Sequence, residues 1–349
     1  MDKPELYMHR CLELARLGAG HTAPNPMVGA VLVYENRVIG EGYHRQYGRE
    51  HAEVNCIRSV RPEDEALVSK SVLYVSLEPC AHFGKTPPCA DLIISRQIPS
   101  VVVGCRDPFP AVNGKGIEKL LAAGVSVNLG VLETACMELN RRFFTFHTRH
   151  RPYIVLKWAQ SADGKIAPPD RSRVFISNEY TNRLVHKWRA EEASILVGTQ
   201  TAMADNPALT ARLWTGPDPV RLVIDTDLRL PRTLQVFDGR VRTIVFNRHR
   251  HEEEENLFYY QLASGSNLVQ QVLLALHELK IQSVLVEGGA RLLESFIDEG
   301  YWDEARVITN EDLIIGEGIP APVPENGVSI GKEKIFSDTI RYYNNPASL

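Results

Sequence analysis

The pattern that most constrains the fold is His51-Ala52-Glu53, followed by Pro79-Cys80 and, nine positions later, by Pro88-Cys89. Imidazole and thiolate groups suit Zn²⁺, and three protein ligands leave the fourth position of the metal open for water. Ligation of one metal would require these three separated segments to meet at one point. The neighbouring Glu53 does not fit the ligand pattern, and a carboxyl group in that place can move protons.

Local patterns place two of these segments at the starts of helices. The segment from His51 to Val60 has apolar residues at helical spacing, and Pro87-Pro88 precedes a second helix-like stretch from Asp91 to Ile98. The positive end of a helix dipole favours an anionic ligand such as a thiolate. We therefore interpret the pattern as a catalytic zinc site. Its ligands are His51, Cys80 and Cys89, and its proton-transfer residue is Glu53.

Two other interpretations of this pattern stay open at the level of sequence. The residues could coincide by chance among eleven histidines and six cysteines, or His82 could complete a purely structural zinc site as a fourth ligand. All six cysteines lie in the first 136 residues of a large chain, which is unlike a small disulfide scaffold. The cysteines outside the pattern lie in apolar stretches and are predicted core residues: Cys11, Cys56, Cys105 and Cys136.

Length and charge narrow the class of protein further. A chain of 349 residues is long enough for two domains, each with its own core. The net charge is −4 and neither half is basic, which argues against a nucleic-acid partner. No apolar run approaches the roughly eighteen residues of a membrane span, and Met1–Tyr7 has no basic and apolar leader. We therefore expect a cytoplasmic protein that binds neither nucleic acid nor membrane.

Strands and helices alternate in both halves, which predicts an α/β fold on each side of a junction near Thr148–Pro152. In the first half we expect strands at 27–34, 37–43, 72–77, 101–105 and 125–129, and helices at 51–60, 91–98, 116–123 and 139–147. In the second half we expect strands at 153–158, 195–197, 221–225, 243–246 and 283–286, and helices near 180–190, 268–279 and 291–299. The acidic run Glu252–Glu255 is predicted to be a solvated turn.

The loop between Cys80 and Cys89 is longer than the common Pro-Cys-x-x-Cys signature of zinc deaminases. Together with Pro24-Asn25-Pro26-x-Val28-Gly29, Gly42-Tyr43-His44 and Leu77-Glu78-Pro79-Cys80, it resembles the deaminase domain of the bifunctional riboflavin-biosynthesis deaminase/reductase family. The resemblance covers almost all of residues 1–147. It implies a cytidine-deaminase-like α/β/α sandwich for that domain.

The second half resembles the reductase domain of the same family. The motifs that carry this resemblance are Ser161-x-Asp163-Gly164-Lys165, Trp188-Arg189-Ala190-Glu191, Ala204-Asp205-Asn206-Pro207-x-Leu209-Thr210-x-Arg212, Val223-Ile224-Asp225 and Val286-Glu287-Gly288-Gly289. Taken alone, a Gly-Gly turn between strand and helix is more often structural than a phosphate site, and the Gly-x-Gly-x-x-Gly fingerprint is missing. The resemblance implies an α/β domain similar to dihydrofolate reductase over residues 150–349.

The resemblance implies two consecutive reactions on a phosphorylated pyrimidine. The first is hydrolytic deamination of 2,5-diamino-6-ribosylamino-4(3H)-pyrimidinone 5′-phosphate. The second is reduction of the ribosyl group to ribityl with NADPH, which gives 5-amino-6-(5-phosphoribitylamino)uracil. The implied cofactors are one Zn²⁺ per chain and NADPH.

The family's functional positions map onto this sequence residue by residue. In the deaminase half, the resemblance places the substrate against Asn25, His44, His82, Lys85 and Asp107. In the reductase half, it places the phosphorylated substrate against Arg189, Leu209, Arg212 and Glu287. It places NADPH against Ala159, Phe175, Thr201, Asp205, Thr226 and the segment Gly289, Ala290, Arg291, Leu292, Leu293, Glu294 and Ser295. Arg173 stands where the family commonly has Ser, and we leave it out of the binding residues.

One departure from the family concerns the deaminase pocket, where Phe109 replaces a common Asn. The alternative function is a nucleoside or nucleic-acid zinc deaminase fused to an unrelated or inactive α/β domain. The near-neutral charge of the first half and the long zinc loop argue against it. The sequence leaves the oligomeric state open, a homo-oligomer included.

Overall fold

The computed structural model describes residues 3–83, 87–265 and 267–348. The chain divides into two compact units, Met1–His150 and Arg151–Leu349. The division falls within the junction expected near residues 148–152. Each unit has its own sheet and its own buried clusters of apolar side chains.

The first unit is built on a five-stranded sheet in the order β2-β1-β3-β4-β5. β1 and β2 form an antiparallel hairpin, and β1 also pairs antiparallel with β3, whereas β3, β4 and β5 run parallel. The strands are β1 Gly29–Tyr34, β2 Arg37–Tyr43, β3 Val72–Leu77, β4 Ser100–Cys105 and β5 Ser126–Leu129. These bounds confirm the strands expected in this half to within two residues.

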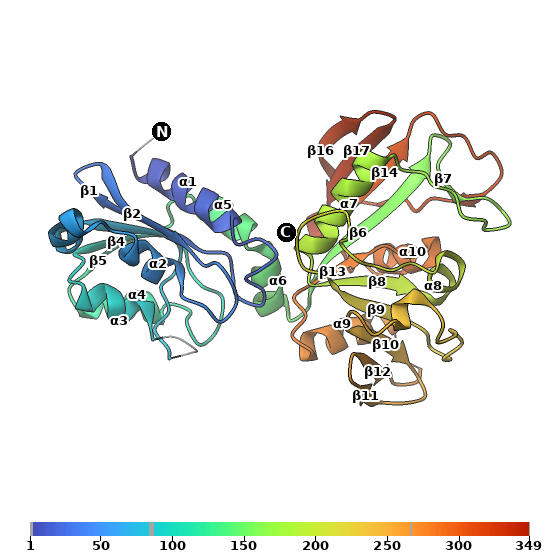
Figure 1. The fold of residues 1–349 in the computed structure, drawn as a ribbon, viewed down its shortest axis with the longest axis horizontal. Helices are drawn as coiled ribbons and strands as arrows, with labels where there is room; N and C mark the ends of the chain where they lie inside the picture. The colour runs from blue at the N-terminus through green and yellow to red at the C-terminus, as the bar shows by residue number, and fades with distance from the viewer. Residues whose placement is uncertain (1–2, 84–86, 266, 349) are drawn as a thin grey trace. The chain divides into compact units, whose positions relative to one another are not determined.

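Helices cover both faces of this sheet (Figure 1). One face packs against α1 (Lys3–Arg16) and α5 (Glu133–Leu139), and the other against α2 (Ala52–Arg58), α3 (Cys89–Ser95) and α4 (Lys115–Ala122). The unit also contains the 3₁₀ helix η1 (Pro62–Lys70) and ends with α6 (Arg141–Arg149). The prediction of four core cysteines is confirmed, because Cys11, Cys56, Cys105 and Cys136 are all buried.

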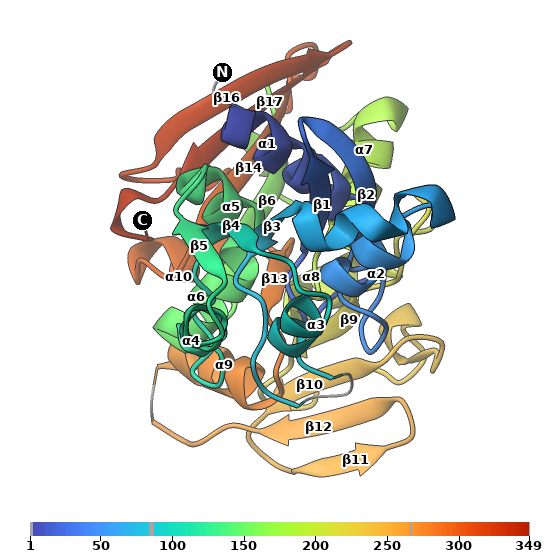
Figure 2. The same ribbon diagram turned by 90° about the vertical axis from the view of Figure 1, so that its left-hand side faces the viewer.

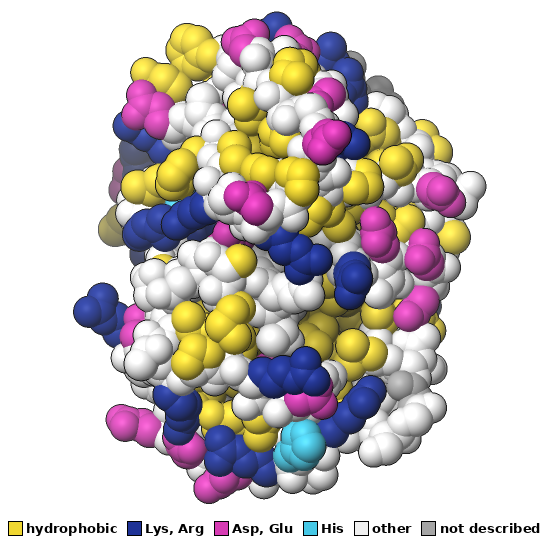
Figure 3. All heavy atoms as spheres, turned by 90° about the vertical axis from the view of Figure 1, so that its right-hand side faces the viewer, with side chains coloured by type: hydrophobic (Ala, Val, Ile, Leu, Met, Phe, Trp, Pro, Cys, Tyr) yellow, Lys and Arg dark blue, Asp and Glu magenta, His cyan; other side chains and the backbone are white. Residues whose placement is uncertain are grey.

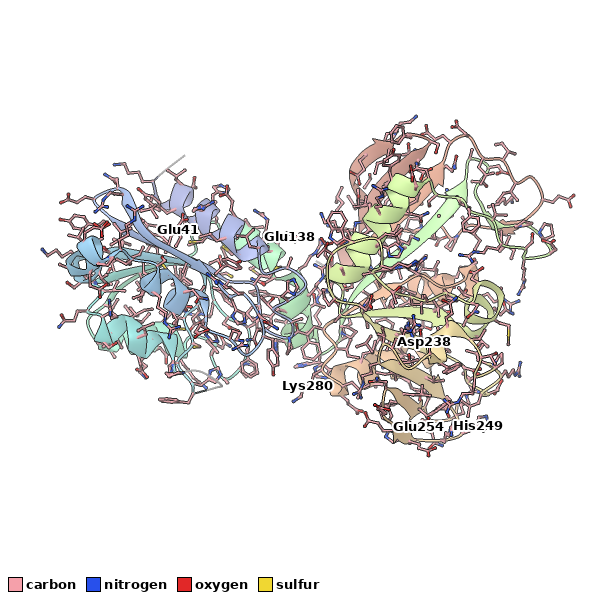
Figure 4. The ribbon with its side chains drawn as sticks, in the orientation of Figure 1. Glu41, Glu138, Asp238, His249, Glu254 and Lys280 are labelled. Atoms are coloured by element: carbon pink, nitrogen blue, oxygen red, sulfur yellow. The ribbon has the colours of Figure 1, made fainter. Side chains whose placement is uncertain are left out.

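Charged side chains tie the first helix to the sheet edge. Arg10 of α1 donates from Nε to Oε1 of Glu41 at 2.7 Å and from Nη2 to Oε2 at 2.9 Å. Glu41 lies on β2 and is labelled in Figure 4. This two-point contact fixes α1 along the antiparallel hairpin.

The second unit is built on a ten-stranded sheet in the order β11-β12-β10-β9-β8-β13-β6-β14-β17-β16. The strands from β12 to β14 run parallel, and the antiparallel pairs β11-β12 and β14-β17-β16 lie at opposite edges (Figure 2). The parallel strands are β6 Tyr153–Ser161, β8 Ser194–Gly198, β9 Val220–Ile224, β10 Thr243–Asn247, β12 Leu257–Gln261, β13 Ser283–Val286 and β14 Glu304–Asn310. The edge strands are β11 Glu252–Glu254, β16 Val328–Ile335 and β17 Asp338–Asn344.

The remaining elements of the second unit cover this sheet and extend it. Side chains of α9 (Leu268–Glu278) and α10 (Ala290–Asp298) pack on one face, and those of α7 (Glu179–Glu191) and α8 (Thr199–Asp205) belong to clusters on the other. A small two-stranded sheet joins β7 (Lys165–Ala167) to β15 (Ile319–Pro320). Two 3₁₀ turns complete the unit, η2 (Gln235–Phe237) and η3 (Pro346–Ser348). Within the described residues, no helix combines the length and the apolar character that a membrane crossing requires.

The prediction of a turn at Glu252–Glu255 is wrong. Residues 252–254 form β11, which pairs antiparallel with β12. Arginines neutralise the acidic edge, because Arg242 donates to Glu253 at 2.7 Å and Arg232 donates to Glu254 at 2.9 Å. An edge strand presents backbone groups that could pair with another chain, and charged side chains there discourage such pairing. Glu254 is labelled in Figure 4.

Asp303 joins the two ends of the second unit. Its carboxylate accepts from both outer nitrogens of Arg151 at 2.6 and 2.8 Å and from the backbone N–H of Ile154 at 2.8 Å. It also accepts from the hydroxyl of Ser348 at 2.8 Å. The Asp303 side chain is only 3% exposed, so these contacts compensate for the loss of water around a charged group.

We expect Asp303→Ala to lower the free energy of unfolding of the second unit by about 3 kcal/mol, because it leaves the largely buried Arg151 guanidinium without its anion. Urea unfolding of the variant and of the wild type measures the difference. The matched control is Glu252→Ala, which removes the exposed partner of Arg250 and should cost less than about 1 kcal/mol. Equal losses in the two variants would contradict the role given to Asp303.

Candidate functional site

The three predicted metal ligands meet in the first unit. His51 Nδ1, Cys80 Sγ and Cys89 Sγ all lie within 4.8 Å of one another. The distance from His51 Nδ1 is 3.6 Å to Cys80 Sγ and 3.3 Å to Cys89 Sγ. The sequence pattern therefore corresponds to one cluster in space.

Local structure explains how the segments meet. Cys80 lies just beyond the end of β3, His51 caps the start of α2, and Cys89 is the first residue of α3. The backbone N–H of Cys89 donates to Cys80 Sγ at 3.3 Å, and the carbonyl of Cys80 accepts from the N–H of Ala90 at 3.1 Å. The expected arrangement, with two helix starts beside the metal ligands, is present.

The cluster fits Zn²⁺. Tetrahedral zinc with bonds of about 2.3 Å to sulfur and 2.0–2.1 Å to nitrogen places N and S ligand atoms about 3.6 Å apart, close to the observed separations. Among the described residues, no fourth His, Cys, Asp or Glu joins the group. His82, the candidate for a fourth structural ligand, is exposed and contacts the Phe109 ring instead, with centroids 6.1 Å apart. Three ligands are the set expected for a catalytic metal rather than a structural one.

Electrostatics of the cluster favour metal binding and proton transfer. The Cys89 thiol and its N–H hold the pKa of Cys80 well below the usual range of a thiol, and the hydrogen bond with Cys80 raises the pKa of His51. Glu53 is 3% exposed and does not belong to the ligand group. Burial raises the pKa of Glu53 above its usual value, which brings the carboxyl group closer to the neutral range where it can both accept and donate a proton.

Hydrogen bonds set the state of His44, whose ring lies 5.5 Å from that of His51. Nδ1 lies 3.0 Å from the carbonyl oxygen of Glu50, which can only accept, so Nδ1 carries the proton. Nε2 is then an acceptor for the Asn25 amide, 3.2 Å away. Burial lowers the pKa of His44 and favours this neutral form. The structure thus brings Asn25 and His44 together next to a metal ligand.

The other residues expected to bind the pyrimidine differ in their placement. Asp107 is buried directly after β4, and burial raises its pKa to about 7. Its Oδ1 accepts from the backbone N–H of Phe109 at 2.7 Å. His82 approaches the same segment through the Phe109 ring. Lys85 lies outside the described residues.

The second unit contains a cavity of about 950 Å³. Every position expected to bind NADPH lines it, and so do three of the four positions expected to bind the phosphorylated substrate. The lining cofactor positions are Ala159, Phe175, Thr201, Asp205, Thr226 and 289–295, and the lining substrate positions are Arg189, Leu209 and Glu287. Figure 3 shows a face of this unit on which Lys and Arg side chains lie among hydrophobic ones.

The Gly288-Gly289 turn between β13 and α10 forms part of this cavity. A Cβ atom on Gly288 would lie 2.6 Å from Cα of Val197 and 2.8 Å from the backbone N of Gly198, so only glycine fits against β8. Gly289 has φ +58°, a backbone conformation that glycine adopts readily. Bare backbone at the start of a helix suits the close approach of a phosphate, so the turn fits a dinucleotide cofactor.

A buried ion cluster forms one wall of the cavity. Arg189 donates from Nε to Oε1 of Glu287 at 2.8 Å and from Nη2 to Oε2 at 2.7 Å. Lys157 Nζ lies 3.8 Å from Glu287 Oε2. Burial by itself would raise the pKa of Glu287. Arg189 and Lys157 flank the carboxylate and instead lower this pKa to about 2. Lys157 was not among the residues expected from the sequence, although a cation inside the otherwise apolar strand Tyr153–Trp158 is a local signal for it.

The ion cluster bears on the expected role of Arg189 and Arg212 in binding the phosphorylated substrate. Two of the three guanidinium nitrogens of Arg189 bind Glu287, and Nη1 donates to the carbonyl of Thr210 at 3.2 Å. In this structure the Nε–Nη2 side of the Arg189 guanidinium is therefore occupied by Glu287 and is not free to bind a phosphate bidentately. Arg212 is exposed and does not line the cavity. Burial and the charges of both arginines lower the pKa of His186, so both arginines lie near this one side chain, and their expected binding of the phosphorylated substrate stays a prediction.

Arg173 and Arg229 also line the cavity. The Arg173 guanidinium lies over the Phe175 ring, 4.7 Å from its centroid. Arg173 was left out of the expected binding residues, but its position makes it a further candidate for contact with a molecule in the cavity. Arg229 Nη2 forms an ion pair with Asp227 Oδ2 at 2.7 Å.

Known families match both halves of the sequence. Residues 1–105 match the cytidine and deoxycytidylate deaminase zinc-binding region, and residues 152–332 match the RibD C-terminal domain. These matches, with the mixed α/β units described above, confirm the expected fold class. The second match contradicts the alternative in which the second half is an unrelated domain.

Curated relatives and solved structures match nearly the whole chain. The riboflavin biosynthesis protein RibD of Aquifex aeolicus is 42% identical and covers 90% of this chain and 88% of its own. That of Bacillus amyloliquefaciens is 39% identical over 94% and 90%. A diaminohydroxyphosphoribosylaminopyrimidine deaminase/5-amino-6-(5-phosphoribosylamino)uracil reductase from Thermotoga maritima has 37% identity and a TM-score of 0.89, covering 98% and 99% of the two chains. Acinetobacter baumannii RibD has 30% identity and a TM-score of 0.89.

We expect the purified protein to contain about one zinc ion per chain, measured by elemental mass spectrometry. Cys80→Ser should lose most of the metal, because a hydroxyl is a much poorer zinc ligand than a thiolate. Cys56→Ala is the matched control, since this buried cysteine belongs to the core of the same unit and not to the ligand group. Retention of zinc by Cys80→Ser would contradict the ligand assignment.

Proposed function

The chain belongs to the RibD family of riboflavin biosynthesis proteins, and from that membership we propose how its residues divide the work of two reactions. The protein is a bifunctional enzyme with a zinc-dependent deaminase domain and an NADPH-dependent reductase domain. The observation that carries the assignment of residues is the separation of two sites. The His51–Cys80–Cys89 cluster lies in the first unit, and the cavity with the Gly288-Gly289 turn lies in the second.

In the deaminase, the first unit hydrolyses the 2-amino group of 2,5-diamino-6-ribosylamino-4(3H)-pyrimidinone 5′-phosphate and releases ammonia. His51, Cys80 and Cys89 would hold zinc, which would supply a Lewis acid that makes water a nucleophile near neutral pH. Glu53 takes a proton from the attacking water on its carboxylate and delivers it to the departing amine. Its buried position and raised pKa support this role, because one group must serve as base and then as acid.

Three polar residues of the first unit would hold the pyrimidine. The amide of Asn25 binds His44, and the oxygen of that amide is left for a donor on the substrate ring. His44 keeps Asn25 oriented, because its own Nδ1–H is fixed by the carbonyl of Glu50. Asp107 lies just beyond β4 and has a pKa of about 7, so its carboxyl group can donate or accept a hydrogen bond at neutral pH.

In the reductase, the second unit converts the ribosyl group of the deaminated product to ribityl, giving 5-amino-6-(5-phosphoribitylamino)uracil. NADPH supplies the hydride for this step. Reduction of the sugar carbon also needs a proton, and Lys157 carries one in the wall of the cavity. Burial lowers the pKa of Lys157 and favours its neutral form, whereas Glu287 raises that pKa and favours the charged form. The Glu287 carboxylate can also accept hydrogen bonds from sugar hydroxyls.

The Arg189–Glu287 pair suggests a different role for Arg189 from a phosphate clamp. The guanidinium fixes both carboxylate oxygens of Glu287, and the Thr210 carbonyl fixes the guanidinium in turn. We therefore assign Arg189 to holding Glu287 in place at the substrate end of the cavity. NADPH would lie along Thr201, Thr226 and the start of α10, where the cofactor positions line the cavity.

We propose the cytoplasm as the place where the enzyme acts. All six cysteines are free thiols, and the zinc cluster depends on two of them. A reducing compartment keeps such thiols available for the metal. The partners that this assignment requires are small molecules, namely the pyrimidine phosphate and NADPH.

We expect Glu53→Gln to retain zinc and to lower ammonia release by at least about 10²-fold, because glutamine cannot transfer the proton. Reduction of the deaminated intermediate by the same preparation should be unchanged, since that site lies in the other unit. Cys80→Ser should likewise lose deamination and keep reduction. Mass analysis of products formed with and without NADPH measures both steps. Near-normal ammonia release by the zinc-loaded Gln variant would refute the role of Glu53.

We expect a higher kcat/KM with NADPH than with NADH, because Thr226 and Arg229 at the cavity offer a hydroxyl and a guanidinium to a 2′-phosphate. Thr226→Ala and Arg229→Ala should each lower kcat/KM for NADPH about tenfold and leave that for NADH unchanged. Asp227→Asn should raise kcat/KM for NADPH, because Asp227 competes with phosphate for Arg229. Equal use of both nucleotides by the wild type would exclude this placement of the phosphate.

A further inference from the structure

Glu78 is a buried carboxylate that belongs neither to the metal ligands nor to the residues expected to touch substrate. It lies two positions before Cys80 and is 3% exposed. A charged group removed from water needs compensating hydrogen bonds or an opposite charge. We propose that Glu78 is a positioning residue of the deaminase: it fixes the segment 107–117 against the zinc-ligand segment and thereby holds Asp107 in the substrate pocket.

Among the described residues, the side-chain hydrogen bonds of Glu78 all go to this one segment. Oε2 accepts from the backbone N–H of Asp107 at 3.3 Å and of Gly114 at 3.0 Å. Oε1 accepts from the N–H of Gly116 at 3.0 Å and of Ile117 at 3.3 Å. Both ends of the segment are therefore held by the same carboxylate, and two of the donors belong to the first turn of α4.

The backbone of the segment is shaped to reach the carboxylate. Gly114 has φ +87°, which residues with a side chain rarely adopt. A Cβ on Gly116 would lie 1.9 Å from the carbonyl oxygen of Pro79, so the start of α4 touches the backbone between Glu78 and Cys80. The close approach of these two segments is thus built into the sequence at both glycines.

Glu78 also connects the segment that carries the metal ligand Cys80 with the segment that carries Asp107. The backbone N–H of Glu78 donates to the carbonyl of Cys105 at the end of β4, at 3.0 Å. Asp107 follows two residues later, and its N–H is one of the four donors to Glu78. Movement of the Glu78 side chain would therefore displace Asp107, while Cys80 stays anchored by β3 and by the N–H of Cys89.

A glutamine cannot replace this carboxylate, although it has almost the same shape. Two carboxylate oxygens provide acceptor sites for four N–H groups. The amide of glutamine would turn an NH₂ group toward two of the donors, and those two would lose their acceptor. Glu78→Gln thus removes half of the contact and leaves the volume of the side chain unchanged.

The inference rests on the proposed deaminase function, and the wild-type enzyme tests that function first. If the wild type releases ammonia from the diaminopyrimidine phosphate, we expect Glu78→Gln to keep its zinc. Its KM for deamination should rise about tenfold or more, with a smaller change in kcat, because the binding segment is displaced while the metal cluster is not. Absence of ammonia release by the wild type would instead refute the proposed function itself.

A double-mutant cycle distinguishes positioning from general loss of stability. If Glu78 acts through Asp107, Glu78→Gln should change KM by less than about twofold in an Asp107→Asn background. Asp64→Asn is the matched control: this buried carboxylate binds Arg37 at 2.8 Å and precedes the start of β3, whereas Cys80 follows its end. It should leave the KM of the wild type and of Asp107→Asn unchanged. An unchanged KM in Glu78→Gln, or fully additive effects with Asp107→Asn, would overturn the proposal.

Glu78→Asp provides the second variant if Glu78→Gln does not fold or loses its zinc. The shorter carboxylate keeps the charge but cannot reach all four donors. We expect zinc to be retained and KM for deamination to rise about threefold or more. A wild-type KM in the zinc-loaded Asp variant would contradict the proposal.

Discussion

Both sites depend on the edge of the sheet at which parallel strands end. Carboxyl ends of parallel strands meet at one edge, and the loops that follow them can gather side chains distant in sequence. In the first unit, Cys80 follows β3 and Asp107 follows β4, which pairs parallel with β3. In the second unit, Glu287 follows β13 and Thr226 follows β9, with β8 between these two strands. The antiparallel strands widen the sheets and supply few of the reacting groups.

Three buried glutamates show how surroundings set the role of one residue type. Burial raises the pKa of Glu53 more than the nearby His51 lowers it, so this carboxyl group suits proton transfer. Glu287 is held between Arg189 and Lys157, so it stays ionised and organises a polar wall. Within the described part of the chain, the Glu78 carboxylate accepts from backbone N–H groups alone, so it shapes the chain around it. The residue type alone therefore does not tell whether a buried glutamate transfers protons, balances a positive charge or holds the backbone in place.

The sequence predicted the elements whose patterns are local. Apolar strands such as Tyr153–Trp158 and the zinc pattern could be found because their signals lie in short, regular stretches. The strands that the sequence did not predict are β7, β11, β12, β14, β15, β16 and β17. β16 shows one reason: its side chains are all exposed or half-exposed, so it lacks an alternating buried face. The ion pair between Arg189 and Glu287 could not be predicted either, because the two residues are 98 positions apart in the sequence. Neither residue carries a local signal that names its partner. Pairings of that kind follow from the order of strands in the sheet, which local patterns do not determine.

Asp303 has a consequence for how this protein can be rearranged. Its contacts with Arg151 and Ser348 place the first and last residues of the second unit next to each other. A unit whose ends adjoin can be circularly permuted with a short linker, or inserted into a surface loop of another protein, with little distortion of its core. The ends of the second unit therefore place little constraint on the order in which the two units are joined, and we expect this unit to keep its fold when it is permuted or produced as a separate polypeptide.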